Sequence, residues 1–189
     1  MNAVMAPPPP VVKLMTAEEF MRLHEDDGTE LVKGIVEEIP MLQGKHGKIC
    51  YKTARSFGNH VDENDLGHIM INDSFIKVAQ NPDTVRGADV AYFSYERLPK
   101  GPVPDGLLQV LPDLVIEVHS PSDRWTKVFT KVVEYLEAGV RVVVVLDPAT
   151  ASASVYRADE LQQIFDNGDT LIIPDVLPGF SVPVRQFFE

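Results

Sequence analysis

The chain has 189 residues, 44% apolar and 24% charged, which is long and apolar enough to bury the core of one globular domain. Its formal net charge of −11, with basic residues scattered along the sequence, excludes a protein that grips nucleic-acid phosphates over a broad basic surface. The one cysteine, Cys50, excludes an internal disulfide and a cysteine-based zinc cluster, and is interpreted as a small buried residue in a reducing compartment.

The N-terminus is rich in proline, with four consecutive prolines at 7–10, and predicts a stiff, disordered lead-in over residues 1–12. It lacks the positive start and apolar core of a secretory signal, and the sequence has no apolar run near the ~20 residues that cross a bilayer. We therefore expect a cytoplasmic protein with no membrane partner. Residues 13–189 show no internal repeat and no linker, so a single domain is expected there.

The first expected elements are a short helix and a hairpin. Thr16 and Glu19 have the spacing of a capping box, so a helix should begin there and run through Leu23. Residues 30–39 predict a hairpin that turns at Lys33–Gly34. Apolar spacing predicts a helix over 46–63, and strands are expected at 67–71, 74–78 and 87–93.

Residues 111–147 predict a strand–helix–strand unit around which the rest of the chain is organised. An apolar strand is followed by a Ser-Pro-Ser turn, an amphipathic helix and a second apolar strand that begins after Gly139. Short strands are expected at 154–157, 162–165 and 170–173, and the tail predicts coil with at most a short final helix. The fold class is therefore α+β or α/β, a mixed sheet with two helices packed on it and additional hairpins.

Glu117 is the first candidate for chemistry, because it interrupts an apolar strand. Side chains alternate along a strand, so Asp113, Glu117 and His119 share one face. Asp113 and Glu117 are ~13 Å apart along that strand, too far to share one ion. Asp89 would lie beside Glu117 if residues 87–93 pair antiparallel with 113–118. Two carboxylates at neighbouring strand ends suit Mg²⁺ or Mn²⁺.

Two lysines on the following helix are candidates to join these acids. The spacing of Trp125, Val128, Phe129, Val132 and Leu136 predicts the buried face of the helix. Lys131 lies about 120° from the centre of that face, so its stem could return the ammonium group to the strand end, whereas Lys127 lies nearly opposite.

A structural interpretation competes at each of these positions. Asp89, Asp113 and Glu117 could be strand-end caps or ion-pair partners, and both lysines could be solvated helix charges. Glu117 favours a functional role, because a buried carboxylate costs several kcal/mol unless it is paired or bound to a metal.

The sequence also carries a set of short motifs in order. They are Asp26–Gly34, His46–Gly47, Ala88–Val90, Pro112–Val118, Ser120–Ser122, Lys131–Tyr135, Ala138–Val140, Val145–Pro148, Val155–Arg157 and Leu177–Phe180. This series, over about residues 14–188, resembles the Uma family of putative restriction endonucleases, a former domain of unknown function placed in the PD-(D/E)XK nuclease superfamily.

The resemblance implies a three-layer, restriction-endonuclease-like core with a metal-binding carboxylate pair and a lysine. By position, Asp89 is the aspartate of the motif and Glu117 its acidic residue. His119 stands where the motif lysine is expected, and the resemblance implies that Lys131 replaces it. Glu30 matches a recurring glutamate that would be a further metal ligand.

His46 matches a recurring histidine, for which a capping or packing role is the structural alternative. Ala88 stands where the family usually has proline.

The function implied is a Mg²⁺- or Mn²⁺-dependent endonuclease acting on DNA, with Asp89, Glu117 and Lys131 as catalytic residues. One alternative is a non-catalytic binding or assembly module, in which the Pro/Gly-rich loop expected at 98–106 and the apolar tail at 177–184 serve protein contacts, including a homodimer. The other is a metal-dependent hydrolase of smaller phosphorylated substrates, which would need less basic surface.

Overall fold

The structure is a computed structural model that describes residues 13–24, 28–39 and 44–189. Its helices are α1 (Ala17–His24), α2 (Gly44–Glu63), α3 (Trp125–Ala138) and α4 (Arg185–Phe188). Its strands are β1 (Thr29–Val32), β2 (Ile35–Glu38), β3 (Gly67–Ala79), β4 (Thr84–Ser94), β5 (Leu114–Val118), β6 (Val142–Asp147), β7 (Ser152–Tyr156), β8 (Gln163–Phe165), β9 (Thr170–Ile172) and β10 (Ser181–Pro183). The disordered lead-in predicted for residues 1–12 lies outside the described residues.

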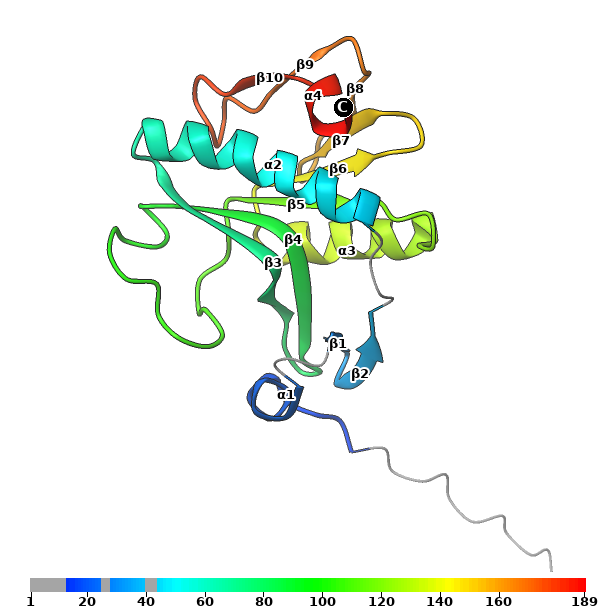
Figure 1. Ribbon diagram of the computed structural model, residues 1–189. Coiled ribbons are helices and arrows are strands. Elements are labelled where there is room, and N and C mark those ends of the chain that lie inside the picture. The colour runs from blue at the N-terminus through cyan, green and yellow to red at the C-terminus, as the bar shows by residue number, and fades with distance from the viewer. Residues whose placement is uncertain (1–12, 25–27, 40–43) are drawn as a thin grey trace, which may run out of the picture.

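An eight-stranded mixed sheet forms the middle layer, in the order β2-β1-β4-β5-β6-β7-β8 with β3 paired to β4. Helix α2 lies across one face of this sheet and α3 lies on the other (Figure 1). The predicted α+β class, with helices flanking a mixed sheet, is confirmed. None of the helices in the described part of the chain is long and apolar enough to cross a membrane.

The predicted strand–helix–strand unit is β5–α3–β6. The two strands run parallel, with Leu114 beside Val142 and Val118 beside Leu146, so the chain must cross over between them through α3. Gly139 ends α3 with a φ of 112°, a left-handed conformation that side chains disfavour. This unit fixes Glu117 and Lys131 on elements that are adjacent in the fold.

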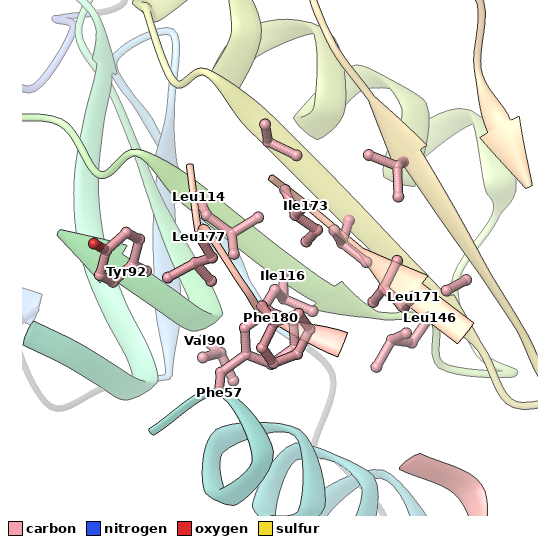
Figure 2. Packing of buried hydrophobic residues seen from close by; sticks show 14 of the residues in the cluster. Phe57, Val90, Tyr92, Leu114, Ile116, Leu146, Leu171, Ile173, Leu177 and Phe180 are labelled. Atoms are coloured by element: carbon pink, nitrogen blue, oxygen red, sulfur yellow. The ribbon is translucent and has the colours of Figure 1, made fainter. Parts of the chain in front are cut away.

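The α2 side of the sheet is closed by the C-terminal segment. Phe57 of α2 stacks on Phe180 at 4.2 Å between ring centroids, and Ile116 and Leu171 lie in the same cluster (Figure 2). The strand predicted at 170–173 forms as β9, but the tail predicted as coil also supplies β10, which pairs with β9 as a hairpin. Burial of Phe187 in α4 holds the end of the chain against this layer.

The buried face of α3 differs from the predicted one. Val128, Val132 and Tyr135 are buried, whereas Trp125 and Phe129 are 39% and 43% exposed, so the prediction was wrong for these two aromatic residues. Their rings pack on each other and on the half-buried rings of His119 and Tyr156. The helix is therefore rotated so that Lys131 lies about 70° from the centre of the buried face.

Strand β4 has one edge that is shared by two strands. β3 pairs along its other edge, while the shared edge pairs with β1 at Val85 and with β5 antiparallel from Val90 to Tyr92. Residues 86–89 lie between these two registers. A register shift in the β3–β4 ladder, between Ile71 and Ser74, lies opposite Asp89 and marks a β-bulge or irregularity. This interrupted edge positions the candidate site.

Candidate functional site

Carboxylate side chains satisfy the backbone groups at the interrupted edge of β4. The amide of Gly87 donates to Glu30 Oε1 at 3.0 Å, and the amide of Val118 donates to Asp89 Oδ2 at 2.7 Å. The Gly87 carbonyl accepts from Tyr135 Oη at 3.3 Å and from Lys131 Nζ at 3.4 Å. Buried backbone groups must find partners, so these acids take over hydrogen bonds that a continuous ladder would make.

Glu117 lies on the α3 side of β5 with 9% of its surface exposed. Tyr135 Oη donates to its Oε1 at 2.8 Å, and Lys131 Nζ lies 3.7 Å from its Oε2. Burial raises the pKa of Glu117 to about 8; Asp89 and Glu30 add to the rise, while Lys131 and the Tyr135 hydrogen bond oppose it. In the absence of a cation, Glu117 is therefore protonated more readily than an ordinary glutamate.

Lys131 lies between two carboxylates. Its Nζ is 2.7 Å from Glu30 Oε1, closer than its approach to Glu117. Burial alone would lower the pKa of Lys131, but the charges of Glu117 and Glu30 outweigh it and raise that pKa. The ammonium group is therefore a fixed positive charge. Lys127, on the same helix, is largely exposed, as the helical wheel predicted. Its Nζ lies 3.9 Å from Glu37 Oε2.

Arg86 is a buried cation that links β1, β4 and α3. Its Nη1 donates to Glu30 Oε2 at 2.8 Å and its Nε donates to Glu134 Oε2 at 2.7 Å. Burial opposes ionisation of Glu30, but Lys131 and Arg86 together lower its pKa below the ordinary value. Glu30 therefore stays ionised and fixes the position of Lys131.

His46 approaches from α2, on the other side of the same strand ends. Its Nε2 lies 2.9 Å from the carbonyl oxygen of Val118 and 3.4 Å from Asp89 Oδ2. Its Nδ1 lies 3.3 Å from Cys50 Sγ, one helical turn along α2. Cys50 is half-buried rather than fully buried as the sequence predicted.

Asp113 lies far from Glu117, whereas His119 lies at the border of the candidate site. Asp113 is at the opposite end of β5, where it accepts from the Ser94 amide at 2.9 Å and pairs with Arg97 at 3.2 Å. His119 stacks on Trp125 at 4.1 Å, and its Nδ1 is 3.5 Å from Asp147 Oδ1. Asp113 therefore holds strand ends together, while His119 borders the cavity.

A cavity of about 310 Å³ opens at the interrupted edge. Of the predicted site residues it brings together Glu30, His46, Asp89, Glu117, His119 and Lys131, but not Asp113. The acids among its described lining residues are Glu30, Glu37, Glu38, Asp89, Glu117 and Asp123, and the lysines and arginine are Arg86, Lys127 and Lys131. The cavity thus has more negative than positive side chains.

The sequence reasoning did not single out Arg86 or Tyr135. Tyr135 stands four residues after Lys131, so helical spacing alone places both on one side of α3. No comparable signal marks Arg86, because its two glutamate partners come from residues 30 and 134. Its importance depends on the shared edge of β4, which is a tertiary feature.

Two donor sets could hold a cation. Asp89 and Glu117 offer the carboxylate oxygens that hard divalent ions prefer. A second set mixes donor types: one ligand atom each from His46, Cys50 and Asp89 lies within 4.8 Å of the others. Asp89 belongs to both sets.

The fold and the family are shown by comparison with known proteins. A solved structure described as a putative nuclease belonging to DUF820 from Anabaena variabilis has a TM-score of 0.81 and 23% sequence identity to this chain. The match covers 92% of this chain and 97% of that one, so the fold is shared. No curated protein matches the chain. The family model Uma2, described as putative restriction endonuclease, matches residues 17–185, and the chain therefore belongs to the Uma2 family.

Proposed function

We propose that this protein is a divalent-metal-dependent endonuclease that hydrolyses DNA phosphodiester bonds. The observation that carries the proposal is that Asp89, Glu117 and Lys131 line one cavity, at the interrupted edge in the middle of β4 and beside the end of β5. Membership of the Uma2 family supports the same reaction class.

The charges in the cavity fit a divalent cation. A phosphodiester is an anion, and the acids among the described lining residues outnumber the lysines and arginine, so the substrate would be repelled without added positive charge. Burial raises the pKa of Glu117, and the nearby charges of Asp89 and Glu30 raise it further, because both effects disfavour another negative charge in the cavity. Asp89 and Glu117 would hold the cation, which when bound supplies Lewis-acid activation of the phosphate and the attacking water.

Lys131 contributes a positive charge that stays in place during hydrolysis. Its pKa is raised by Glu117 and Glu30, so it does not serve as a general base near neutral pH. The ammonium group would instead orient the attacking water or stabilise the charge that develops on the phosphate oxygens. The 2.7 Å contact between Lys131 Nζ and Glu30 Oε1 fixes the position of the ammonium group in the cavity.

Asp89 and Glu117 are held in fixed orientations before any ligand binds. The Val118 amide fixes Asp89 Oδ2 and the Tyr135 hydroxyl fixes Glu117 Oε1. Glu117 Oε2 is the oxygen nearer Lys131. Such preorganisation lowers the cost of reaching the transition state, because little rearrangement remains.

Plasmid cleavage tests the proposal. Wild-type protein should nick supercoiled plasmid in Mg²⁺ or Mn²⁺ and lose the activity in EDTA. Asp89→Asn, Glu117→Gln and Lys131→Met should each lower the rate by about 10²-fold or more, because each removes a group aimed at the reacting phosphate or its cation.

Matched controls come from the surface. Glu137→Gln changes an exposed glutamate of α3, and Lys100→Met changes an exposed lysine paired with Asp65. Both should cleave at the wild-type rate. Equal nicking by wild type and Lys131→Met would instead identify a contaminating nuclease and overturn the proposal.

A hydrolase of smaller phosphorylated substrates is a second candidate, favoured by the net charge of −11 and the limited cavity volume. A phosphodiester such as bis-p-nitrophenyl phosphate needs no extended basic surface. Metal-dependent turnover of that compound without plasmid nicking, lost in Lys131→Met, would select this candidate over the endonuclease.

A further inference from the structure

The spacing of His46 and Cys50 gives α2 a pair of metal-binding donors on one face. Residues four apart on a helix are neighbours, and Nδ1 of His46 lies 3.3 Å from Cys50 Sγ. Bond lengths of about 2.0 Å to nitrogen and 2.3 Å to sulfur place two such ligands about 3.6 Å apart in a tetrahedral zinc site. The pair is therefore spaced for one shared ion with little movement.

The second nitrogen of His46 is held in the way that metal-ligating histidines require. With the proton on Nε2, the ring donates to the Val118 carbonyl at 2.9 Å, which leaves Nδ1 as the basic nitrogen toward Cys50. Metal-bound histidines commonly donate their other N–H to a carbonyl or carboxylate, which fixes the ring orientation and raises its basicity. His46 is also buried, so its ring is fixed by packing.

Asp89 adds a carboxylate to this pair; its Oδ2 lies 3.4 Å from His46 Nε2, on the side of the ring that faces the Val118 carbonyl. One atom from each of His46, Cys50 and Asp89 lies within 4.8 Å of the others. Sulfur and imidazole ligands select Zn²⁺ over Mg²⁺, whereas a site with carboxylate ligands alone also suits Mg²⁺ or Mn²⁺. Three protein ligands with an open fourth position are the usual arrangement of a non-structural zinc site.

The geometry points to a second cation site, formed by His46, Cys50 and Asp89, that binds a thiophilic divalent ion of the Zn²⁺ class. Binding forms a metal–sulfur bond, and the thiol proton passes to solvent. Asp89 also belongs to the carboxylate pair, so occupancy of this site would withdraw it from Glu117. This regulatory consequence, inhibition by micromolar Zn²⁺, rests on the proposed nuclease function; the binding itself does not.

Cobalt substitution tests the site without any nuclease assay. Purified protein freed of metal is titrated with Co²⁺ under reducing conditions and its absorption spectrum is recorded. A cobalt–thiolate bond gives a charge-transfer band in the near ultraviolet, and tetrahedral Co²⁺ gives strong visible bands. The band identifies its own ligand, because the chain contains one cysteine. Addition of Zn²⁺ should displace Co²⁺ and abolish both features.

Variants and a matched control define the ligands. Loss of an outer-shell partner already costs about 10–100-fold in metal affinity, so Cys50→Ala, Cys50→Ser and His46→Gln should each weaken Zn²⁺ binding at least that much. The thiolate band should vanish in both Cys50 variants. His60→Gln removes a half-buried histidine of the same helix, which contacts the Pro178 carbonyl and is not a member of the proposed site, and this variant should bind Zn²⁺ as wild type does.

Each result decides the inference. Wild-type protein that takes up Co²⁺ without a thiolate band, or that binds no Co²⁺, overturns the site even if every variant were to misfold. A thiolate band together with no plasmid cleavage would support the cation site and contradict the proposed nuclease activity. Mg²⁺-dependent nicking without the thiolate band would support the nuclease and contradict the His46–Cys50–Asp89 site.

Discussion

Tyr135 connects α3 to the acid at the centre of the site. Its single hydroxyl proton is shared between Glu117 Oε1, at the shorter distance of 2.8 Å, and the Gly87 carbonyl oxygen at 3.3 Å, and the whole side chain is buried. That hydrogen bond favours the ionised form of Glu117 and so opposes the rise in its pKa. Tyr135 is therefore a positioning residue that also assists ionisation of a metal ligand.

Tyr135→Phe should raise the pKa of Glu117 further and weaken Mg²⁺ binding most below pH 8. The pH–rate profile should shift to higher pH, with kcat recovering in alkaline buffer, and the protein should lose about 1–3 kcal/mol of stability. Measurement of cleavage from pH 6 to about 9 checks the shift. Tyr51→Phe, at an exposed tyrosine of α2, should leave the profile in place. A uniform loss at all pH values would assign Tyr135 a purely structural role.

Glu117 should also make stability depend on pH. Its pKa is about 8 in the folded protein against 4.5 for an ordinary glutamate, so between these values the folded state holds a proton that the unfolded chain has lost. The resulting stabilisation is fully present below pH 4.5 and is lost as pH rises toward 8.

Glu117→Gln removes this dependence. In EDTA the variant should be more stable than wild type at pH 8–9 by on the order of 2–4 kcal/mol, and the two should converge near pH 4–5. Urea denaturation at each pH measures the difference. A wild-type stability that is flat from pH 5 to about 8 would mean that Glu117 is ionised without a cation.

At the scale of elements, Arg86 holds β1, β4 and α3 together from a buried position. It pairs with Glu30 of β1 and Glu134 of α3, and Glu30 in turn contacts Lys131. Removing one partner of a buried ion pair leaves an uncompensated charge, which costs more than the pair itself contributes. The position of α3 over the site therefore depends on the two ion pairs of Arg86.

Arg86→Met should destabilise the protein by about 3–5 kcal/mol, because Glu30 and Glu134 lose their buried cation. Arg86→Lys should recover part of this loss, since lysine keeps the charge but cannot make both contacts in the same geometry. Urea midpoints measure the series, and Lys100→Met, at an exposed pair with Asp65, should unfold nearly as wild type does. A midpoint for Arg86→Met close to that control would mean that α3 is held by apolar packing alone.

The elements that sequence predicted best are those with a strong local signal. The capping box forms as expected, with the Glu19 amide donating to Thr16 Oγ1 and the Thr16 amide donating to Glu19 Oε2. The alternation that separated Ile116 from Glu117 holds, because the two residues lie on opposite faces of β5. Local patterns predict an element well where the spacing of its apolar residues marks which side is buried.

Tertiary features account for the rest. Apolar spacing placed Trp125 and Phe129 on the buried face of α3, but the sheet accepts the side of the helix that carries Val132 and Tyr135. Aromatic residues can stack on one another at the surface, so hydrophobicity alone does not fix the rotation of a helix. The antiparallel pairing of β4 with β5 was predicted and is confirmed. The pairing of the same edge of β4 with β1 was not predicted, because β1 is distant in sequence and no local pattern marks the contact.

For the whole molecule, the net charge of −11 limits how duplex DNA could be held. Each phosphate neutralised by a lysine or arginine releases counterions and steepens the dependence of affinity on salt. Among the described residues that line the cavity, Arg86 is buried between two glutamates, Lys131 lies 2.7 Å from Glu30, and Lys127 is exposed with a longer contact of 3.9 Å to Glu37. Binding should therefore rely on few contacts.

Salt dependence measures that number. With Ca²⁺ in place of Mg²⁺, the anisotropy of a labelled duplex should give a plot of log affinity against log salt with a slope of about −1 to −2, since the slope is about −0.9 per phosphate contact. Lys127→Met should make the slope shallower by about one, whereas Lys100→Met, remote from the cavity, should not change it. A slope of about −6 or steeper would require an extended basic surface. This chain does not display one in its sequence, so a partner would have to supply it.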